Sequence, residues 1–419
     1  MPNNIILTPS IYVKGVLMNL GGYLTVCRNM SKEYSKEFAK ANAKVGDTVS
    51  VKKPQRFQTT TGLLYQPQPL SGTKVNITVG DVTGVHFNWD SVEKTLDIED
   101  AQENYFKPAA IALAHAINAQ GAQYAAQNTW NAVGVPGVTP STVQTYLNAG
   151  DKIVEQGLPP MEDLTCIVNR KFSSAYVVGQ STLFNPAGQI SGMVTKGAMA
   201  ENTLGYKFER DQTIYSQTVG PQGGVPLVDA TLVYGAISAD GGNNATMTLG
   251  TRGWTASANS RLVVGDRFTI ANVYTVHPQT RQSTGSLALF QVRQAFSSLA
   301  GGQGGVLIAP AITPSGQSQN VTAAPIDGAA ITVFGAPGTV SPQALLMHRN
   351  AFAFVSVPLS TPASGEGVMY SAMHTDPDTG ISLALVQFFD GVNRIVGTRF
   401  DTLTGFGSLY PEMSCVLAG

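Results

Sequence analysis

The chain has 419 residues, and its 26 Lys and Arg nearly balance 27 Asp and Glu, so the formal net charge is −1. Only 13% of residues are charged, about half the usual share of roughly 25%. These values exclude a protein whose overall charge draws it to nucleic acid or to an anionic membrane. Hydrophobic residues make up 43% of the chain, which is too many for a disordered protein and enough for a large core.

The three cysteines, Cys27, Cys166 and Cys415, are isolated and form no CxxC pair. This sparse, odd-numbered set favours a reducing compartment and argues against a disulfide scaffold. Residues 1–26 are mildly apolar but lack a basic start and a clean hydrophobic core, so they do not read as a signal peptide. We find no apolar run long enough to cross a bilayer.

The N-terminal region reads as an arm. Residues 1–30 are short apolar pieces interrupted by proline and glycine, which we expect to lie over another surface. Ser31 to Ala43 then predicts a short helix, because Ser31 can cap it and Tyr34 and Phe38 share one face.

An extended hairpin follows. Thr48 to Val51 alternates as a strand, and two more strands are expected at Thr73–Val79 and Val82–Trp89. The segment between the first two is rich in Gly, Pro and Gln, and a tip of this length is usually functional or contacts a partner. Lys52, Lys53 and Arg56 form the densest basic cluster in the sequence. A contact with an acidic patch on another subunit and a solvated strand end remain equally open for it.

The longest helical pattern runs from Ile98 to Val133. Alanines crowd it, its early carboxylates suit the positive end of a helix dipole, and Gly134 and Pro136 are normal stop signals. Pro108 lacks a backbone donor, so it should kink this helix or start a second one at Lys107.

The next region mixes helices and strands. Ser141–Gln156 is amphipathic, with Val143, Tyr146, Leu147, Ile153 and Val154 on one face. We then expect a buried strand at Leu164–Val168, a helix at Lys171–Val178, a glycine-rich loop at Leu183–Ala200 and a strand at Leu204–Ile214.

From about Gly220 the pattern changes to short strands separated by Gly and Asn turns. Residues 222–336 show almost no helical pattern, which predicts an all-β module inserted into an α+β chain. Four aromatic residues are available for its core: Trp254, Phe268, Phe290 and Phe296. The earlier mixed style returns at 341–357, and Ile381–Phe389 and Gly391–Thr398 predict strand, turn and strand.

The sequence carries no recognisable catalytic, cofactor or metal site. The five histidines are scattered without zinc spacing, and no Walker loop, GxSxG elbow or dinucleotide fingerprint occurs. His115 reads as a core or interface residue. Asp376–Gly380 resembles part of a calcium loop but lacks the terminal glutamate and the ligand spacing, so a β-turn is favoured over metal binding.

The order of the parts resembles a known family. The arm, the short helix, GDTVSVKKPQRF at Gly46–Phe57, the helix approached through Tyr105–Pro108 and the final strand pair resemble the major capsid (coat) proteins of tailed double-stranded DNA bacteriophages. Those proteins have the Hong Kong ninety-seven-type fold. The segment GDRFTIANVYTVHPQTRQSTG at Gly265–Gly285 is similar to the inserted β-barrel-like domain of the branch typified by a Salmonella podovirus.

This resemblance, which covers nearly the whole chain, implies an α+β phage capsid fold. It assigns 1–47 to an N-terminal arm and short helix, 48–92 to an extended loop that overlaps a neighbouring subunit, and 93–140 to the spine helix of the peripheral domain. The axial domain comprises 141–221 and 337–380, the inserted β domain comprises 222–336, and the strands of 381–419 return to the peripheral domain. Candidate inter-subunit contacts in the loop are Lys52, Lys53, Arg56, Phe57, Leu63, Leu64 and Tyr65.

The implied function is structural: a major capsid protein, not an enzyme, that self-assembles into the icosahedral head around the phage DNA, without cofactor or metal. Implied partners are further copies in hexamers and pentamers, a separate scaffolding protein, a portal protein and packaged DNA contacted non-specifically; a decoration protein is left open, and no membrane is involved. The implied location is the virion, after assembly in the bacterial cytoplasm. A β-rich phage tail or surface binding protein and a carbohydrate-acting enzyme remain as alternatives.

Overall fold

The computed structural model describes residues 13–14, 16–17, 20, 23–33, 48–54, 57, 59, 63, 65, 67–68, 74–90, 105–158, 163–180, 199, 202–232, 245–256, 260–360, 362, 367–376, 379–393 and 395–419. The chain divides into two compact units. The first comprises Met1–Val49, Ile77–Ala122 and Ala353–Gly407, and the second comprises Ser50–Asn76, Gln123–Phe352 and Ser408–Gly419.

A long sheet organises the first unit. Its strands follow the order β1 (Thr48–Lys52), β2 (Lys74–Asp90), β20 (Ile395–Ser408), β19 (Ser382–Asp390) and β18 (Tyr370–Thr375), and β17 (Phe352–Val357) also pairs with β20. β19 and β20 are antiparallel, and Asp390 lies opposite Ile395 beside the turn that joins them. The expected strand, turn and strand near the C-terminus is therefore confirmed.

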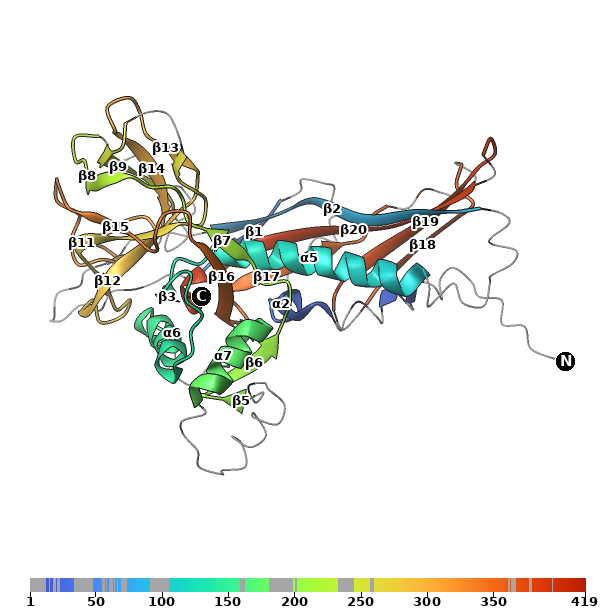
Figure 1. Ribbon diagram of the computed structural model, residues 1–419, viewed down its shortest axis with the longest axis horizontal. Helices are drawn as coiled ribbons and strands as arrows, with labels where there is room; N and C mark the ends of the chain where they lie inside the picture. Colours follow the sequence, from blue (N-terminus) through green and yellow to red (C-terminus); the bar gives the residue numbers. More distant parts are fainter. Residues whose placement is uncertain are drawn as a thin grey trace. The chain divides into compact units, whose positions relative to one another are not determined.

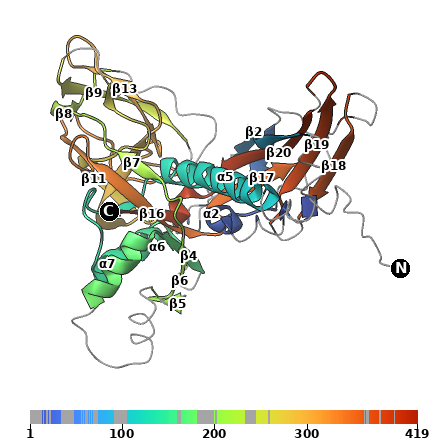
Figure 2. The same cartoon turned by 45° about the vertical axis from the view of Figure 1, so that its right-hand side comes forward.

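Helix α5 (Lys107–Gln127) packs on this sheet through its first turns. In both views the helix lies along the strands (Figures 1 and 2). The Phe106 ring meets Phe87 of β2 and Phe400 of β20 edge to face, with centroids 5.8 and 5.7 Å apart. Fully buried alanines such as Ala110 and Ala114 allow the helix backbone to approach the strands closely. The short helix α2 (Thr25–Arg28) is tied to α5 by the Val26 N–H, which donates to Asn118 Oδ1 at 2.9 Å.

The C-terminal end of α5 differs from the expected 98–133 range. Tyr105 and Phe106 are π-helical, and the regular α-helix begins at Lys107, the residue at which Pro108 was expected to kink the helix or start a second one. The helix ends at Gln127 because Asn128 and Thr129 donate side-chain hydrogen bonds back to the carbonyls of Tyr124 and Ala125. Residues 98–104, with the early carboxylates, lie outside the described residues.

The expected strands 73–79 and 82–89 are one continuous strand, β2. Its register against β20 shifts between Val79 and Asp81, which marks a β-bulge at Gly80 instead of a turn. β1 pairs with β2 as the expected hairpin requires. Most of the tip between them, most of the helix expected at 31–43, most of the N-terminal arm and the loop at 183–198 lie outside the described residues.

A second sheet and two helices form one part of the second unit. The strand order is β3 (Ala132–Gly134), β21 (Ser414–Ala418), β16 (Val340–His348), β4 (Leu164–Val168), β6 (Tyr206–Arg210) and β5 (Asn202–Thr203), and β7 (Ser216–Thr218) also pairs with β16. Helices α6 (Val143–Glu155) and α7 (Arg170–Gln180) share a core with the strands. The helices and β4 were expected, but Val154 is exposed, so it does not belong to the buried face of α6.

A separate sheet lies within residues 222–336, which we call the insert. Its strand order is β15 (Ile331–Val333), β11 (Arg267–Val276), β12 (Ser283–Val292), β14 (Gly304–Ala309), β9 (Met247–Trp254) and β8 (Gly224–Val228). The Val228 N–H donates to Ala329 O at 2.9 Å, and the Gly328 N–H donates to Val228 O at 3.0 Å. These bonds join the two ends of the sheet, so it closes into a barrel. A short pair, β10 (Ser260–Leu262) with β13 (Phe296–Ser297), lies beside it.

The barrel interior is apolar. Its buried cluster contains all four aromatic residues expected there: Trp254, Phe268, Phe290 and Phe296. The two ends of the insert meet, because the Val219 N–H donates to Thr339 O at 2.9 Å and the Gly338 N–H donates to Val219 O at 3.1 Å. The insert therefore leaves and re-enters the host chain at adjacent backbone positions.

The C-terminal region, residues 381–419, is divided between the two large sheets. β19 and most of β20 lie in the first, whereas β21 pairs with β16 in the second, after a short 3-10 helix η4 (Pro411–Met413). The chain turns between them where the N–H groups of Leu409 and Tyr410 both donate to Ala351 O at 3.0 Å.

Candidate assembly surface

The base of the extended loop is held by side-chain hydrogen bonds between its strands. Ser50 Oγ of β1 donates to Asn76 Oδ1 of β2 at 2.8 Å. Lys52, at the end of β1, is exposed. Lys53 is half-buried, and its Nζ lies 4.9 Å from the centroid of the Tyr410 ring, which forms a cation–π contact.

Beyond this base the loop presents large apolar side chains to solvent. Phe57 is 63% exposed and Tyr65 is 87% exposed, and Leu63 is fully exposed. Arg56 and Leu64 lie outside the described residues. The structure therefore brings Lys53 and Phe57 to a common surface with the C-terminal segment, while Leu63 and Tyr65 lie further along the exposed loop.

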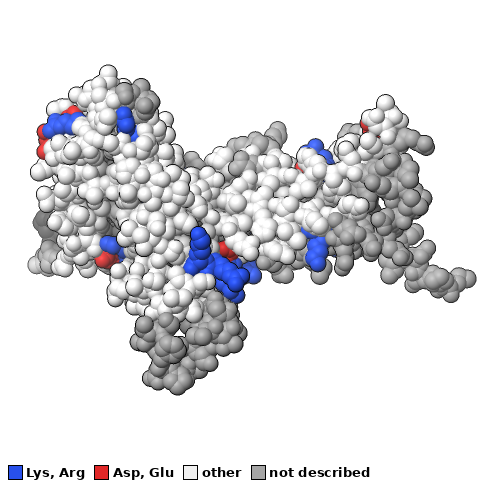
Figure 3. Space-filling model, in the orientation of Figure 1, with Lys and Arg blue, Asp and Glu red and all other residues white. Residues whose placement is uncertain are grey.

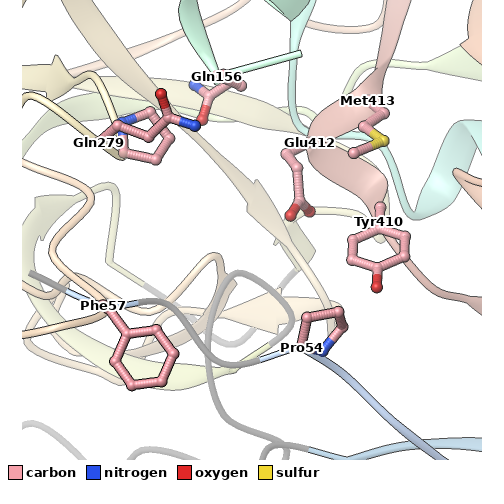
Figure 4. Close-up of a pocket in the computed structure, with 9 residues that line it drawn as sticks. Pro54, Phe57, Gln156, Gln279, Tyr410, Glu412 and Met413 are labelled. Atoms are coloured by element: carbon pink, nitrogen blue, oxygen red, sulfur yellow. The ribbon is translucent and has the colours of Figure 1, made fainter. Parts of the chain in front are cut away.

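Phe57 lines a pocket of about 420 Å³ (Figure 4). The loop contributes Pro54 and Phe57, and the segments after α6, around Pro278 of the insert and in η4 contribute the rest: Gln156, Gly157, Pro278, Gln279, Tyr410, Glu412 and Met413. Rings, prolines and a methionine suit an apolar side chain, and Glu412 is a buried acid in the wall. Sequence reasoning missed this pocket because four distant segments build it.

A second feature fixes the insert to the end of α5. Arg267 of β11 donates from Nε to Thr129 O at 2.9 Å and from Nη2 to Ala126 O at 2.8 Å. Gln291 of β12 donates to the same Ala126 O at 3.1 Å. Ala126 O belongs to the last turn of α5, where backbone acceptors lack internal partners and carry partial negative charge, and Thr129 O lies just beyond it.

Arg293 extends this joint. Its Nη1 donates to Gln127 O at 2.9 Å and also contacts Asn128 Oδ1. Burial lowers the pKa of the Arg267 and Arg293 guanidinium groups to about 10, so both remain charged at neutral pH. We call Arg267, Gln291 and Arg293 the helix-end clamp. The sequence offered no signal for it, since its members lie about 140 residues or more from the helix end that they contact.

The titratable groups that could carry chemistry are dispersed. Among the described residues no group of three His, Cys, Asp or Glu side chains could hold a metal ion. His115 is half-buried and packs against Tyr23, with ring centroids 5.4 Å apart and ring planes tilted by 55°. Asp376 accepts hydrogen bonds from the N–H and hydroxyl of Thr379. These bonds are those of a turn, which the sequence favoured over a metal site.

The three cysteines are buried free thiols. Burial raises the pKa of the Cys415 thiol to about 12 and raises that of Cys166 further, so neither forms a reactive thiolate at neutral pH. None of the helices in the described part of the chain is long and apolar enough to cross a membrane.

Exposed large apolar side chains such as Phe57, Leu63 and Tyr65 are typical of a surface that makes protein–protein contacts. Comparison with known proteins defines the class as a phage shell protein. A family model described as "P22 coat protein - gene protein 5" matches residues 3–419. The chain belongs to the P22 coat protein family. It is a major capsid protein that forms the head shell, and this match confirms the α+β phage capsid fold and the structural role expected above.

Solved structures are similar at low identity. A structure from "Mycobacterium phage Che8" is 11% identical, with a TM-score of 0.44, over 93% of this chain and 89% of that chain. The "Capsid structure of the Cyanophage P-SCSP1u" is 11% identical, with a TM-score of 0.42, over 90% and 83%. The "CUS-3 coat protein I-domain" is 30% identical, with a TM-score of 0.16, over 28% of this chain and 96% of that chain. No curated protein matches.

Proposed function

We propose that the extended loop, residues 48–92, carries the principal contact between neighbouring copies in the head shell. The observation that supports this role is the solvent exposure of Phe57, Leu63 and Tyr65. Groups of exposed large apolar side chains mark interaction surfaces. A loop can carry such side chains to a neighbouring copy without a large exposed hydrophobic patch on the body of the subunit. Lys52, Lys53, Arg56 and Leu64 complete the proposed contact set.

The remaining partners follow from the shell role. Copies of the chain assemble as hexamers and pentamers in the bacterial cytoplasm, with a separate scaffolding protein and a portal protein, and the closed head encloses double-stranded DNA. The protein acts by assembly and not by catalysis. The insert is an independent β domain with its own core, and the region of α6 and α7 forms the axial domain.

Charge reversal tests the loop. The variant Lys52→Glu/Lys53→Glu/Arg56→Glu should lower the yield of shells at least tenfold while costing the free subunit only about 1 kcal/mol, mainly through loss of the Lys53–Tyr410 cation–π contact. Exposed charges contribute only about 0–1 kcal/mol to stability, whereas charge at an interface strongly affects association. Shell yield is measured by electron microscopy and sedimentation with scaffold supplied.

The matched control is Lys14→Glu/Lys107→Glu/Arg349→Glu, which makes the same change of charge at three exposed residues outside the loop. If both triple variants assemble equally well, the basic cluster is only solvated and the loop proposal fails. If discrete monomers persist for the unaltered chain with scaffold present, the shell assembly itself is refuted.

A further inference from the structure

Three exposed cations gather at the start of α7. Arg170 and Lys171 are its first two residues, and Arg210 is the last residue of β6. Figure 3 shows the largest blue area on this face over the start of α7 and the end of β6, with a small red area beside it. We call Arg170, Lys171 and Arg210 the basic patch.

The strand register brings these residues together although forty positions separate them. β4 and β6 are parallel neighbours, and Val168 lies opposite Arg210. The Asp211 N–H donates to Val168 O at 3.0 Å, so the two chains leave the sheet side by side. Asn169 then caps α7 by accepting the Phe172 N–H at 2.9 Å, which turns the chain directly into the helix. Adjacent strands lie about 4.8 Å apart, so the three cations lie near one another at the C-terminal ends of β4 and β6.

The patch is not neutralised within the described part of the chain, where none of its three cations forms a salt bridge. The acids nearest in sequence are engaged elsewhere: Glu209 pairs with Lys207 at 2.8 Å, and Asp211 accepts the N–H and hydroxyl of Thr213. Cations at the first turn of a helix also repel its positive end. The arrangement is therefore unfavourable for the subunit alone and suits an anionic partner.

Several described acids that a second copy could offer are already engaged within their own chain. Asp229 and Asp327 share Arg252, and Glu155 pairs with Lys152. Asp390 bonds to Asn393. A phosphate backbone, in contrast, is a continuous anion, and guanidinium groups match its oxygens with paired donors.

We propose that the basic patch binds the phosphate backbone of double-stranded DNA, without reading its sequence. The inference rests on the proposed function, in which the shell encloses the genome, and it assigns that contact to Arg170, Lys171 and Arg210. Each copy supplies only three charges, so a single subunit binds weakly. A shell presents the same patch many times, which gives the contact avidity without strong binding by any one subunit.

The test measures binding of the full-length, unassembled subunit to a fluorescent duplex of about 20 base pairs, by anisotropy over a range of NaCl concentrations. Each phosphate contact adds about −0.9 to the slope of log K against log salt, so three contacts give about −2.7. Binding should then weaken roughly 20-fold between 50 and 150 mM salt. The variant Arg170→Gln/Lys171→Gln/Arg210→Gln should lose most of this slope.

The matched control is Lys74→Gln/Lys107→Gln/Arg349→Gln, which removes the same charge from separate exposed sites and should keep the slope within one contact of the unaltered chain. Thermal melting of the patch variant should be unchanged or slightly raised, because the cations oppose the helix dipole. Equal losses in both triple variants would reduce the effect to net charge and overturn the proposal.

Absence of duplex binding by the unaltered chain would also overturn it. If in that case the patch variant fails to form shells, the patch belongs to a contact with another protein surface. The loop proposal and the DNA proposal can be refuted independently. Normal shells from the loop charge-reversal variant, together with a reduced salt slope in the patch variant, would refute the loop contact and keep the DNA site.

Discussion

Replacing Arg267 with methionine should loosen the insert from the end of α5. Arg267 is 3% exposed and has no carboxylate partner in the helix-end clamp; its guanidinium donates to Thr129 O at 2.9 Å and to Ala126 O at 2.8 Å. It also lies 3.4 Å from Gln343 Oε1 of β16. Methionine keeps much of the packed volume and removes all of these donors.

The expected cost follows from which acceptors lose their partners. Two strong hydrogen bonds from a charged donor contribute about 1.5–3 kcal/mol each. Ala126 O retains the Gln291 amide at 3.1 Å, whereas Thr129 O is left without its Arg267 donor. Relief from burying a cation offsets part of the loss. We therefore expect Arg267→Met to destabilise the subunit by about 3 kcal/mol.

The two clamp residues on Ala126 O should also be coupled. Gln291→Met alone should cost about 1 kcal/mol, because Arg267 still serves that carbonyl. The double variant should cost more than the sum of the single variants, since the carbonyl then loses both donors.

Urea unfolding of the free, full-length subunit, followed by tryptophan fluorescence, measures these differences. Arg349→Met removes an exposed arginine and should stay within about 0.5 kcal/mol of the unaltered chain. A loss for Arg267→Met no larger than that control, or strict additivity of the two clamp variants, would refute the view that the clamp satisfies the helix end.

Three further outcomes are expected. Proteases should cleave within the Gly- and Pro-rich segment 58–71 in the free subunit and not in shells; equal cleavage would contradict an inter-subunit role. Residues 222–336 expressed alone should give dispersed amide NMR shifts and a cooperative melt, whereas a random-coil spectrum would make the insert part of the host core. Cys27, Cys166 and Cys415 should resist a thiol reagent at pH 8 in the native subunit and react after unfolding, so rapid native labelling would argue against their burial.

Local patterns predicted most elements whose residues carry their own signals. The alternation and turn residues of 222–336 indicated a β module, and the amphipathic stretch at 141–156 indicated α6, because burial in these elements follows the period of the strand or helix. The break expected at Gly80 was wrong, because a bulge absorbs one residue and lets β2 continue.

Features set by distant residues were not predictable from one sequence. The last helical residue of α5 depends on Asn128 and Thr129, but the acceptors beyond it are satisfied by the clamp from the insert. The basic patch escaped notice for the same reason. The density of basic residues along the sequence singled out Lys52, Lys53 and Arg56 as the main basic cluster. The parallel pairing of β4 and β6, in contrast, places Arg210 beside the start of α7.

Two adjacent residues, Asp266 just before β11 and Arg267 at its start, restrict rotation of the insert about its linkers. Asp266 Oδ2 accepts the N–H groups of Gly220 and Val263 at 3.0 and 2.9 Å, which holds the incoming chain, and burial raises the pKa of this carboxyl. Arg267, next to it, holds the end of α5. Because both side chains are buried, the insert cannot turn about its linker without uncovering a carboxyl, a guanidinium and the carbonyls they satisfy. Unpaired buried groups of this kind cost several kcal/mol together, so the last turn of α5 and the insert should move as one body.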